Sequence, residues 1–281
     1  MRKVACYDPE CALVCQPETA SKTTIDHNFS MNIINLIASD IFRSRKSVFS
    51  RLSPQDCALC SSSTPSVVCA DCDASLPRSG QSVCPRCAVE LNTGESNEEL
   101  CGSCLVYSPH FDHTITAFRY DFPVDRLLQA YKFQAQLAFT HFLADALVKR
   151  VRDNRSLTLA TLPDLILPTP LAAKRLAVRG FNQSALLGRA VGSLMGIGFS
   201  AEALKRVRET IPQSGLKRDE RLKNVRGAFA CGIDLEGKRV AIVDDVMTTG
   251  ATLSEAAKAL KENGAVYVEA WACARTAHHE L

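Results

Sequence analysis

The sequence predicts an α/β fold, in which an open parallel sheet with helices on both faces is preceded by a small cysteine-rich module that binds zinc. Three observations support this prediction. Strand-like and helical patterns alternate after residue 108, which is typical of parallel strands joined by right-handed crossovers. One strand-like run, Val240–Val243, leads into a turn rich in hydroxyl groups and then into a helical pattern. Four Cys-x-x-Cys pairs lie within residues 57–104.

The length and composition fit one full domain and a small module. With 281 residues, 46% of them hydrophobic, the chain can bury a core of ordinary size. We predict a poorly patterned extension over residues 1–52, a double zinc-finger module over 53–108 and the α/β domain over 109–281. An apolar run at 31–42 is compatible with one helix inside the extension.

Eight of the 13 cysteines predict tetrahedral zinc sites. Two thiolates three residues apart can bind one Zn²⁺ from a tight turn, and two such turns complete a four-sulfur site. Four pairs suffice for two ions, held by neighbouring or by alternating pairs, or for one ion and one vacant set. An iron–sulfur cluster uses the same ligands, but we predict structural zinc, because the segment has few large apolar residues with which to form a core. The predicted ligands are Cys57, Cys60, Cys69, Cys72, Cys84, Cys87, Cys101 and Cys104.

The strand and helix signals follow in the order that such a fold requires. Residues 108–120 predict one or two short strands, and Pro123 begins a helix that continues through Ala130. Pro168 is expected to stop the next strand, and Gly264 to end the last helix. The later elements are expected as a helix at 137–151, a strand at 164–167, a helix at 182–195, a strand at 203–207, a polar and turn-rich segment at 209–227, a strand at 240–243, a helix at 251–263 and a strand at 266–274.

The most specific pattern is the stretch Arg239–Thr252. Asp244 and Asp245 follow its apolar run, at the strand end where ligands bind in open α/β sheets. Two carboxylates there can accept hydrogen bonds from the vicinal hydroxyls of a ribose, and small hydroxyl-bearing residues at a helix N-terminus can hold a phosphate. The phosphate-binding residues predicted in this way are Thr248, Thr249, Gly250, Ala251 and Thr252. The pattern therefore predicts a sugar-phosphate site.

A mononucleotide P-loop is the main competing interpretation of this stretch. It requires a lysine directly after its second glycine, whereas no lysine follows Gly250 until Lys258. The ordered pattern instead resembles the signature with which type I phosphoribosyltransferases bind phosphoribosyl pyrophosphate (PRPP). This resemblance implies the type I phosphoribosyltransferase fold, PRPP with Mg²⁺ as the ligand, and Asp244 and Asp245 as the residues at the reaction centre.

Further motifs narrow the family. The cysteine pairs, Leu167–Pro170, Arg179–Gln183 and Arg221–Phe229 are similar to the ComF family, over residues 55–275. The resemblance implies a hood over the active site near residues 109–135. It also implies, for some relatives, a role in natural transformation with a helicase-like competence partner. Members usually carry glycine in the hood where this chain has Ala135.

The resemblance also implies the remaining parts of a PRPP site. The loop after the strand at 164–167 would bind the pyrophosphate, with Thr169, Lys174, Arg175 and Arg179 as candidates. A lid over Arg206–Arg226 would exclude water from the oxocarbenium-like ribose. The candidate lid residues are Arg208, Gln213 and Arg221.

The charge distribution favours a second function as well. Residues 171–229 contain 12 Lys or Arg and four Asp or Glu, an excess of eight positive charges (12 − 4), although the whole chain carries only +3. Such a surface suits pyrophosphate or a nucleic-acid backbone. We therefore expect either a phosphoribosyltransferase with a small acceptor, or a non-catalytic, PRPP-responsive protein that binds single-stranded DNA through the zinc module and the basic surface.

No apolar run approaches the ~18 residues of a membrane span, and no apolar stretch follows the basic N-terminus as it would in a signal peptide. We therefore expect a cytoplasmic protein. In that compartment thiols stay reduced, so the cysteines are not expected to form disulfides.

Overall fold

The structure is a computed structural model that describes residues 55–91, 99–134, 136–158, 161–209 and 218–277. The predicted extension at 1–52 with its helix, Ala135 and the candidate lid residue Gln213 lie outside these residues. Only the backbone of Arg221 is described.

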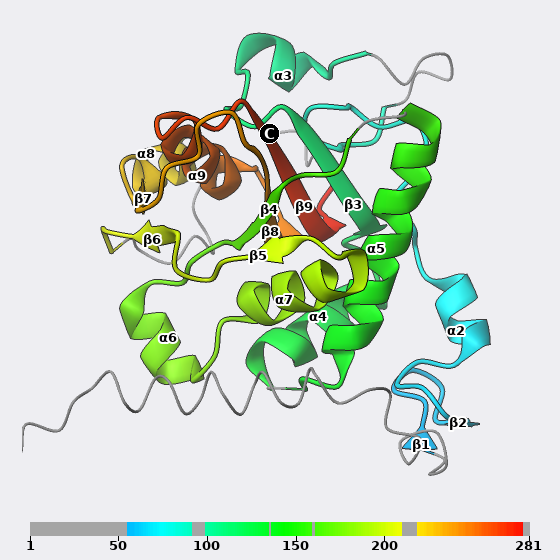
Figure 1. The fold of residues 1–281 in the computed structure, drawn as a ribbon. Helices are drawn as coiled ribbons and strands as arrows, with labels where there is room; N and C mark the ends of the chain where they lie inside the picture. Colours follow the sequence, from blue (N-terminus) through cyan, green and yellow to red (C-terminus); the bar gives the residue numbers. More distant parts are fainter. Residues whose placement is uncertain (1–54, 92–98, 135, 159–160, 210–217, 278–281) are drawn as a thin grey trace, which may run out of the picture. The chain divides into compact units, whose positions relative to one another are not determined.

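A five-stranded parallel sheet forms the centre of the α/β domain (Figure 1). Its strands lie in the order β3 (His113–Arg119), β9 (Tyr267–Arg275), β8 (Arg239–Met247), β4 (Leu165–Pro168) and β5 (Gly198–Phe199). Most residues of β8 and β9 are buried, as expected of central strands covered on both faces. The two strands pair in register as far as Met247 and Arg275.

Helices cover both faces of this sheet. The helix α9 (Ala251–Lys261) buries Leu253 and Leu260 in a core that it shares with Val240 and Val268 of the central strands. On the other face, α5 (Phe139–Thr158) and α7 (Gln183–Met195) pack against each other and against the sheet (Figure 1). The shorter α4 (Val124–Phe133) packs on α5. The predicted open sheet with helices on both faces is confirmed.

Two segments differ from the expectation. The strand expected at 203–207 is present as β6 (Leu204–Arg206), but it pairs antiparallel with β7 (Phe229–Cys231) in a separate ribbon. The segment at 209–227, expected to be turn-rich, contains the helix α8 (Arg218–Val225). A further helix, α6 (Ala173–Arg179), was not predicted, because none of its residues is buried and no apolar periodicity marks it.

The carboxylate pair lies inside β8 and not after it, which corrects the predicted end of this strand. β8 continues to Met247 because β9 offers pairing partners along the same length. Pro168 is likewise paired within β4, opposite Val243, instead of stopping the strand before itself. A proline is tolerated there because the pairing of β4 with β5 ends at Ile166, so Pro168 has an open edge on that side.

Candidate functional site

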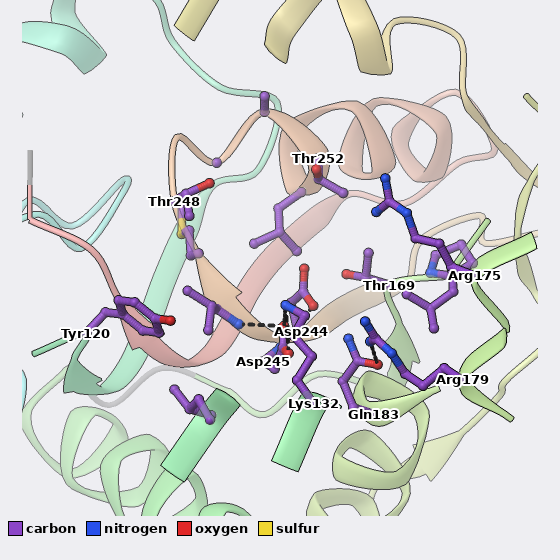
Figure 2. A pocket seen from close by; sticks show the side chains of 18 of the residues that line it. Tyr120, Lys132, Thr169, Arg175, Arg179, Gln183, Asp244, Asp245, Thr248 and Thr252 are labelled. Carbon is purple, nitrogen blue, oxygen red and sulfur yellow. Dashed lines mark hydrogen bonds and ion pairs between the residues drawn. The ribbon is translucent and has the colours of Figure 1, made fainter. Parts of the chain in front are cut away.

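A cavity of about 570 Å³ opens at the carboxyl ends of β4 and β8 (Figure 2). Its walls come from α4, α6, β6, the loop after β4 and the turn before α9. It brings together most of the residues predicted from the sequence, namely Thr169, Arg175, Arg179, Asp244, Asp245, Thr248, Gly250, Ala251 and Thr252. We call Asp244 and Asp245 the carboxylate pair, and residues 248–252 the α9 turn.

The two members of the carboxylate pair have different environments. Asp244 Oδ1 accepts hydrogen bonds from Ser184 Oγ and from the Asp245 N–H, each at 2.9 Å. Asp245 is only 2% exposed, and its Oδ2 lies 3.0 Å from Lys132 Nζ. Burial, together with the charge of Asp245, raises the pKa of Asp244 to about 7. Near neutral pH, Asp244 is therefore only partly ionised.

Replacing Asp244 with asparagine should stabilise the fold at alkaline pH. The folded state raises the pKa of Asp244 from 3.8 to about 7, so stability is lost as the pH rises through this interval and the loss then stays constant. Asp244→Asn removes this loss and should raise the free energy of unfolding at pH 8 by a few kcal/mol, since one pKa unit corresponds to about 1.4 kcal/mol. Urea unfolding at pH 4, 6 and 8 measures the effect. An equal change at pH 4 and pH 8 would contradict this origin.

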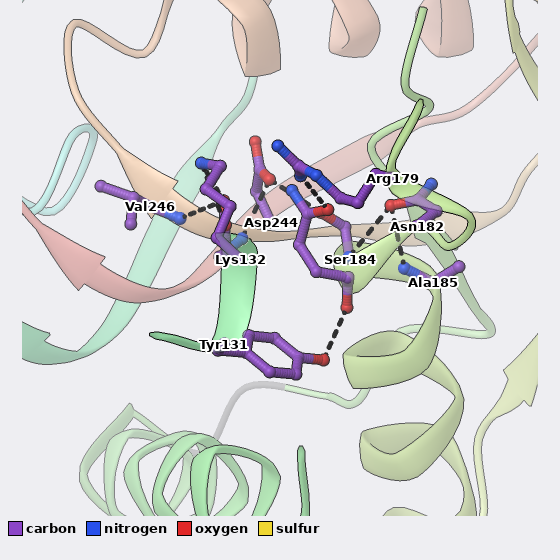
Figure 3. A network of polar contacts seen from close by, with 10 residues as sticks. Tyr131, Lys132, Arg179, Asn182, Ser184, Ala185, Asp244 and Val246 are labelled. Atoms are coloured by element: carbon purple, nitrogen blue, oxygen red, sulfur yellow. Dashed lines mark hydrogen bonds and ion pairs between the residues drawn. The ribbon is translucent and has the colours of Figure 1, made fainter. Parts of the chain in front are cut away.

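Lys132 completes the polar network around the carboxylate pair (Figure 3). It lies in the last turn of α4, and its Nζ is 3.2 Å from Asp245 Oδ1 and 3.0 Å from Oδ2. The preceding Tyr131 anchors this turn, because its hydroxyl donates to the Gln183 carbonyl at 3.0 Å. Burial acts to lower the pKa of Lys132, but the carboxylates of Asp245 and Asp244 outweigh it and the pKa is raised. The ammonium is therefore charged and paired with Asp245.

The α9 turn leaves room for an anion beside Gly250. Gly250 is the N-cap of α9 with φ of +77°, and it has no side chain with which to bond the first N–H groups of the helix. A Cβ at this position would lie 2.7 Å from Met247 Cε and 3.5 Å from the Phe111 ring. A larger residue would therefore have to displace the Met247 methyl and also adopt a left-handed backbone, so glycine suits this position. Although Asp245 is ion-paired, the cavity stays open next to the turn.

One wall of the cavity is positively charged. We call Thr169, Arg175, Arg179 and Arg206 the arginine wall, since all four line the cavity. Arg175 Nη2 and Thr169 Oγ1 are buried without a hydrogen-bond partner within the described part of the chain. Buried polar groups normally have partners, so both indicate a polar ligand. Figure 2 shows Thr169, Arg175 and Arg179 on the far side of Asp244 from Thr248.

Three predicted residues do not line this cavity. Thr249 lines a smaller neighbouring cavity of about 230 Å³, and its Oγ1 accepts a backbone N–H two residues further on at 3.3 Å. Lys174 pairs with Glu209 at 2.9 Å, and 83% of its side chain is exposed. Arg208 donates to two backbone carbonyls at the C-terminal end of α8, at 2.8 and 2.6 Å. Basic side chains commonly bind the last carbonyls of a helix in this way.

Several residues of the site are not predicted from the sequence, and among them are Lys132, Gln183, Ser184 and Arg206. Two of them follow Asn182, which caps α7 by accepting the Ser184 N–H at 3.0 Å and donates to the Thr169 carbonyl at 3.1 Å. Gln183 Oε1 in turn accepts from Arg179 Nη1 at 2.5 Å. The motif Arg179–Gln183 was the available signal, because it joins the N-terminus of α7 to the arginine wall and to the carboxylate pair (Figure 3).

Two sets of four cysteines come together among the described residues. The first set is Cys57, Cys60, Cys69 and Cys72, and the second is Cys84, Cys87, Cys101 and Cys104. In each set the sulfur atoms lie within 4.8 Å of one another, which fits a tetrahedral Zn²⁺ with Zn–S distances of about 2.3 Å. Neighbouring pairs form each set, so the alternative of alternating pairs is excluded. The elements of this module are β1 (Gln55–Asp56), β2 (Ser63–Thr64), α2 (Ala70–Ser75) and α3 (Gly102–Val106).

Arg275 connects the second cysteine set to the start of the α9 turn. Its side chain is buried, and its Nε donates to the carbonyl of the cysteine ligand Cys87 at 2.8 Å. Its Nη1 donates to the Met247 carbonyl at 3.2 Å and to the Thr248 carbonyl. One guanidinium thus fixes the backbone of the cysteine module to the backbone that leads into the candidate phosphate site.

Comparison with known proteins finds the same two parts. Family models described as "Double zinc ribbon domain" and "Phosphoribosyl transferase domain" match residues 48–105 and 169–280. Competence protein F of Haemophilus influenzae is 33% identical over 220 residues, which cover 74% of this chain and 96% of that protein. The chain belongs to the ComF family. A further ComF relative, DNA utilization protein YhgH of Salmonella typhi, is 34% identical and covers 74% of this chain and 90% of its own.

This ComF chain therefore has a phosphoribosyltransferase-type α/β domain preceded by a cysteine-rich module with two sets of zinc ligands. A more distant relative is competence protein ComFC of Streptococcus pneumoniae, with 28% identity over 75% of this chain and 88% of that protein. Among solved structures, adenine phosphoribosyltransferase from Leishmania tarentolae aligns with 58% of this chain and 76% of its own at 16% identity, with a TM-score of 0.34. None of the helices described for this ComF chain has the length and apolar character needed to cross a membrane.

Proposed function

We propose that this chain binds PRPP together with Mg²⁺ and transfers its phosphoribosyl group to a small acceptor. The observation that carries the proposal is the shared cavity, which is lined together by the carboxylate pair, the α9 turn and the arginine wall. PRPP presents one group for each of them, namely a phosphate, a ribose diol and a pyrophosphate. The volume of about 570 Å³ also lies within the usual range of small-molecule sites, about 300–1,000 Å³.

Each wall would bind one part of PRPP. The α9 turn would hold the 5′-phosphate at a helix N-terminus, the carboxylate pair would accept hydrogen bonds from the ribose hydroxyls, and the arginine wall would bind the pyrophosphate. Mg²⁺ usually reaches such sites with substrate phosphates and one or two carboxylates. Asp245 Oδ2, which is ion-paired with Lys132 at 3.0 Å and accepts no backbone N–H from the described residues, suits this role once the ammonium moves away. The ion would neutralise charge on the departing pyrophosphate.

The transfer would break the bond between ribose C1 and the pyrophosphate oxygen and form a bond from C1 to the acceptor. Pyrophosphate would leave with the bonding electron pair, and the acceptor would lose a proton. The negative carboxylate pair would stabilise the oxocarbenium-like ribose, and a closed cavity would keep water away from it. A nucleophilic side chain is not required, because positioning and charge stabilisation can supply the rate enhancement.

Calorimetric titration with PRPP, with and without Mg²⁺, tests the binding step. We expect one PRPP per chain and tighter binding with Mg²⁺. Incubation with PRPP and a panel of bases and amines tests the transfer, with released pyrophosphate as the readout. Absence of PRPP binding under both conditions would refute the proposal. Binding without pyrophosphate release from any acceptor would favour the non-catalytic alternative.

We further propose a role in DNA uptake or use, which the names of the relatives favour. Those names are competence protein F and DNA utilization protein. In this chain, Lys205, Lys223 and Arg226 are exposed on the basic segment around β6 and α8 and do not line the cavity. These cations are suited to a phosphate backbone and are not among the residues that line the proposed PRPP site.

Changing Lys205, Lys223 and Arg226 to alanine should weaken binding of single-stranded DNA in a salt-dependent manner. Each lost phosphate contact reduces the steepness of the plot of log binding constant against log salt concentration by about 0.7. Three lost contacts should therefore reduce it by about 2. Fluorescence anisotropy with a thymidine oligonucleotide, recorded at salt concentrations between about 50 and 200 mM, measures this slope. PRPP affinity serves as the internal control and should not change. An unaltered slope would remove this surface from the DNA proposal.

A further inference from the structure

We propose that Lys132 is an internal counter-ion that keeps a free divalent cation out of the carboxylate pair and admits the cation only together with a polyphosphate ligand. The inference rests on the proposed function and deepens it, because it defines the form in which the ligand enters. That form is a preassembled metal–polyphosphate complex. Lys132 is thereby a positioning and specificity residue, which acts through Asp245.

Lys132 stands where a cation would have to bind. Its Nζ is 3.2 Å from Asp245 Oδ1 and 3.0 Å from Oδ2, and the Asp245 side chain is only 3% exposed. Oδ1 also accepts the Val246 N–H at 2.9 Å. Oδ2 is therefore the oxygen left for a metal, and the ammonium lies beside it. A cation that arrives alone must displace this ammonium from a buried carboxylate.

The charges that line the cavity allow a cation to replace the ammonium only when a polyphosphate accompanies the cation. Four cationic side chains, those of Lys132 and the three arginines of the arginine wall, line the cavity together with the two members of the carboxylate pair. A free Mg²⁺ adds two positive charges to this excess and leaves the displaced ammonium without a partner. A cation bound to a polyphosphate brings more negative charge than positive. The phosphate oxygens can then pair with the arginines and also with the ammonium.

The position of Lys132 allows the ammonium to change partners. Its backbone is fixed at the end of α4, since the neighbouring Tyr131 hydroxyl is bound to the Gln183 carbonyl at 3.0 Å. Its side chain is 29% exposed and has a flexible four-carbon stem. Figure 3 shows this side chain extending from the end of α4 beside Asp244, with Arg179 of the arginine wall on the far side of Asp244. The ammonium can therefore leave Asp245 while the helix that carries it stays in place.

Binding of Mn²⁺, followed by the electron paramagnetic resonance signal of the free ion, tests the inference without any turnover. In the absence of PRPP, Lys132→Met and Lys132→Gln should bind Mn²⁺ at least tenfold more tightly than the wild type. Lys132→Arg, which keeps the charge, should bind it as weakly as the wild type. Lys149→Met serves as the matched control, because Lys149 is an exposed lysine on α5 outside the cavity. It should leave Mn²⁺ affinity unchanged.

The same variants separate this inference from the proposed function. PRPP should strongly increase the Mn²⁺ affinity of the wild type. The increase should be much smaller in Lys132→Met, because this variant already binds Mn²⁺ without PRPP. If thermal unfolding shows that Lys132→Gln and Lys132→Met are folded, and neither binds Mn²⁺ more tightly than the wild type, the counter-ion role is overturned. A wild type that never responds to PRPP overturns the proposed function, whereas tighter Mn²⁺ binding by the variants would still support the counter-ion role.

Discussion

Replacing both members of the carboxylate pair with asparagine should weaken PRPP binding at least about 100-fold. Hydrogen bonds to a charged group contribute about 1.5–3 kcal/mol each, and every 1.4 kcal/mol corresponds to about a factor of ten in affinity. Loss of the charged acceptors for two ribose hydroxyls therefore accounts for at least two orders of magnitude. The variant should still fold, because Asn at position 244 can accept the same hydrogen bonds from Ser184 and from the following N–H. Isothermal titration of Asp244→Asn/Asp245→Asn measures the loss.

Two controls isolate the ribose contribution. Inorganic pyrophosphate lacks the diol, so its affinity should stay constant or rise in the variant, because negative charge has been removed from a cavity that retains its arginines. The double change Asp145→Asn/Asp153→Asn alters the net charge equally at exposed positions of α5 and should leave PRPP binding intact. Retained PRPP affinity in the carboxylate variant would show that this pair does not hold the ribose.

Loss of the second zinc site should destabilise the α/β domain much more than loss of the first. Cys84 and Cys104 are 0% and 5% exposed and belong to the core cluster that includes α9 and the central strands, whereas Cys60 of the first set is exposed. Cys104→Ser should therefore lower the free energy of unfolding by at least about 3 kcal/mol, because it removes metal from a site that replaces apolar packing. This corresponds to a fall of about 6–12 °C in the midpoint of thermal unfolding for a domain of roughly 150–250 residues.

The matched variant is Cys60→Ser, which should lose one zinc ion and change the unfolding midpoint of the α/β domain little. Zinc content and thermal unfolding of both variants provide the comparison. Cys104→Ser should also weaken PRPP binding, because Arg275 ties the Cys87 carbonyl to the Met247 carbonyl at the start of the α9 turn. Equal midpoints in the two variants would contradict a supporting role for the second site. Iron in place of zinc in the purified protein would overturn the metal assignment.

Much of the fold is predictable because it depends on local pattern. The run Val240–Val243 is apolar throughout, which is typical of a strand buried on both faces, and it forms the N-terminal half of β8, the middle strand of the sheet. The helix at 182–195 carries its own start signal, the capping Asn182. The exposed helix α6 has no such pattern and was missed. The domain boundaries near residues 53 and 109 stay predictions.

The site is predictable where one continuous motif supplies it. Asp244, Gly250 and Thr252 are neighbours in sequence, and the strand and helix on either side bring them to one cavity. Lys132 and Arg206 come from segments distant in sequence, where a lone basic residue is more often a solvated surface charge. Only the packing of α4 and β6 at the carboxyl ends of the strands makes them part of the site.

By itself, the sequence determined the chemistry that this protein can carry: four pairs of cysteines suited to zinc, a carboxylate pair and a hydroxyl-rich turn before a helix. These features are local, because each is encoded in residues a few positions apart. The tertiary structure decided which cysteine pairs share a metal and which basic side chains reach the cavity. It also placed an ammonium against Asp245. Those outcomes depend on how distant segments pack, and such packing is set by the burial of the whole core, which no single stretch of the chain encodes.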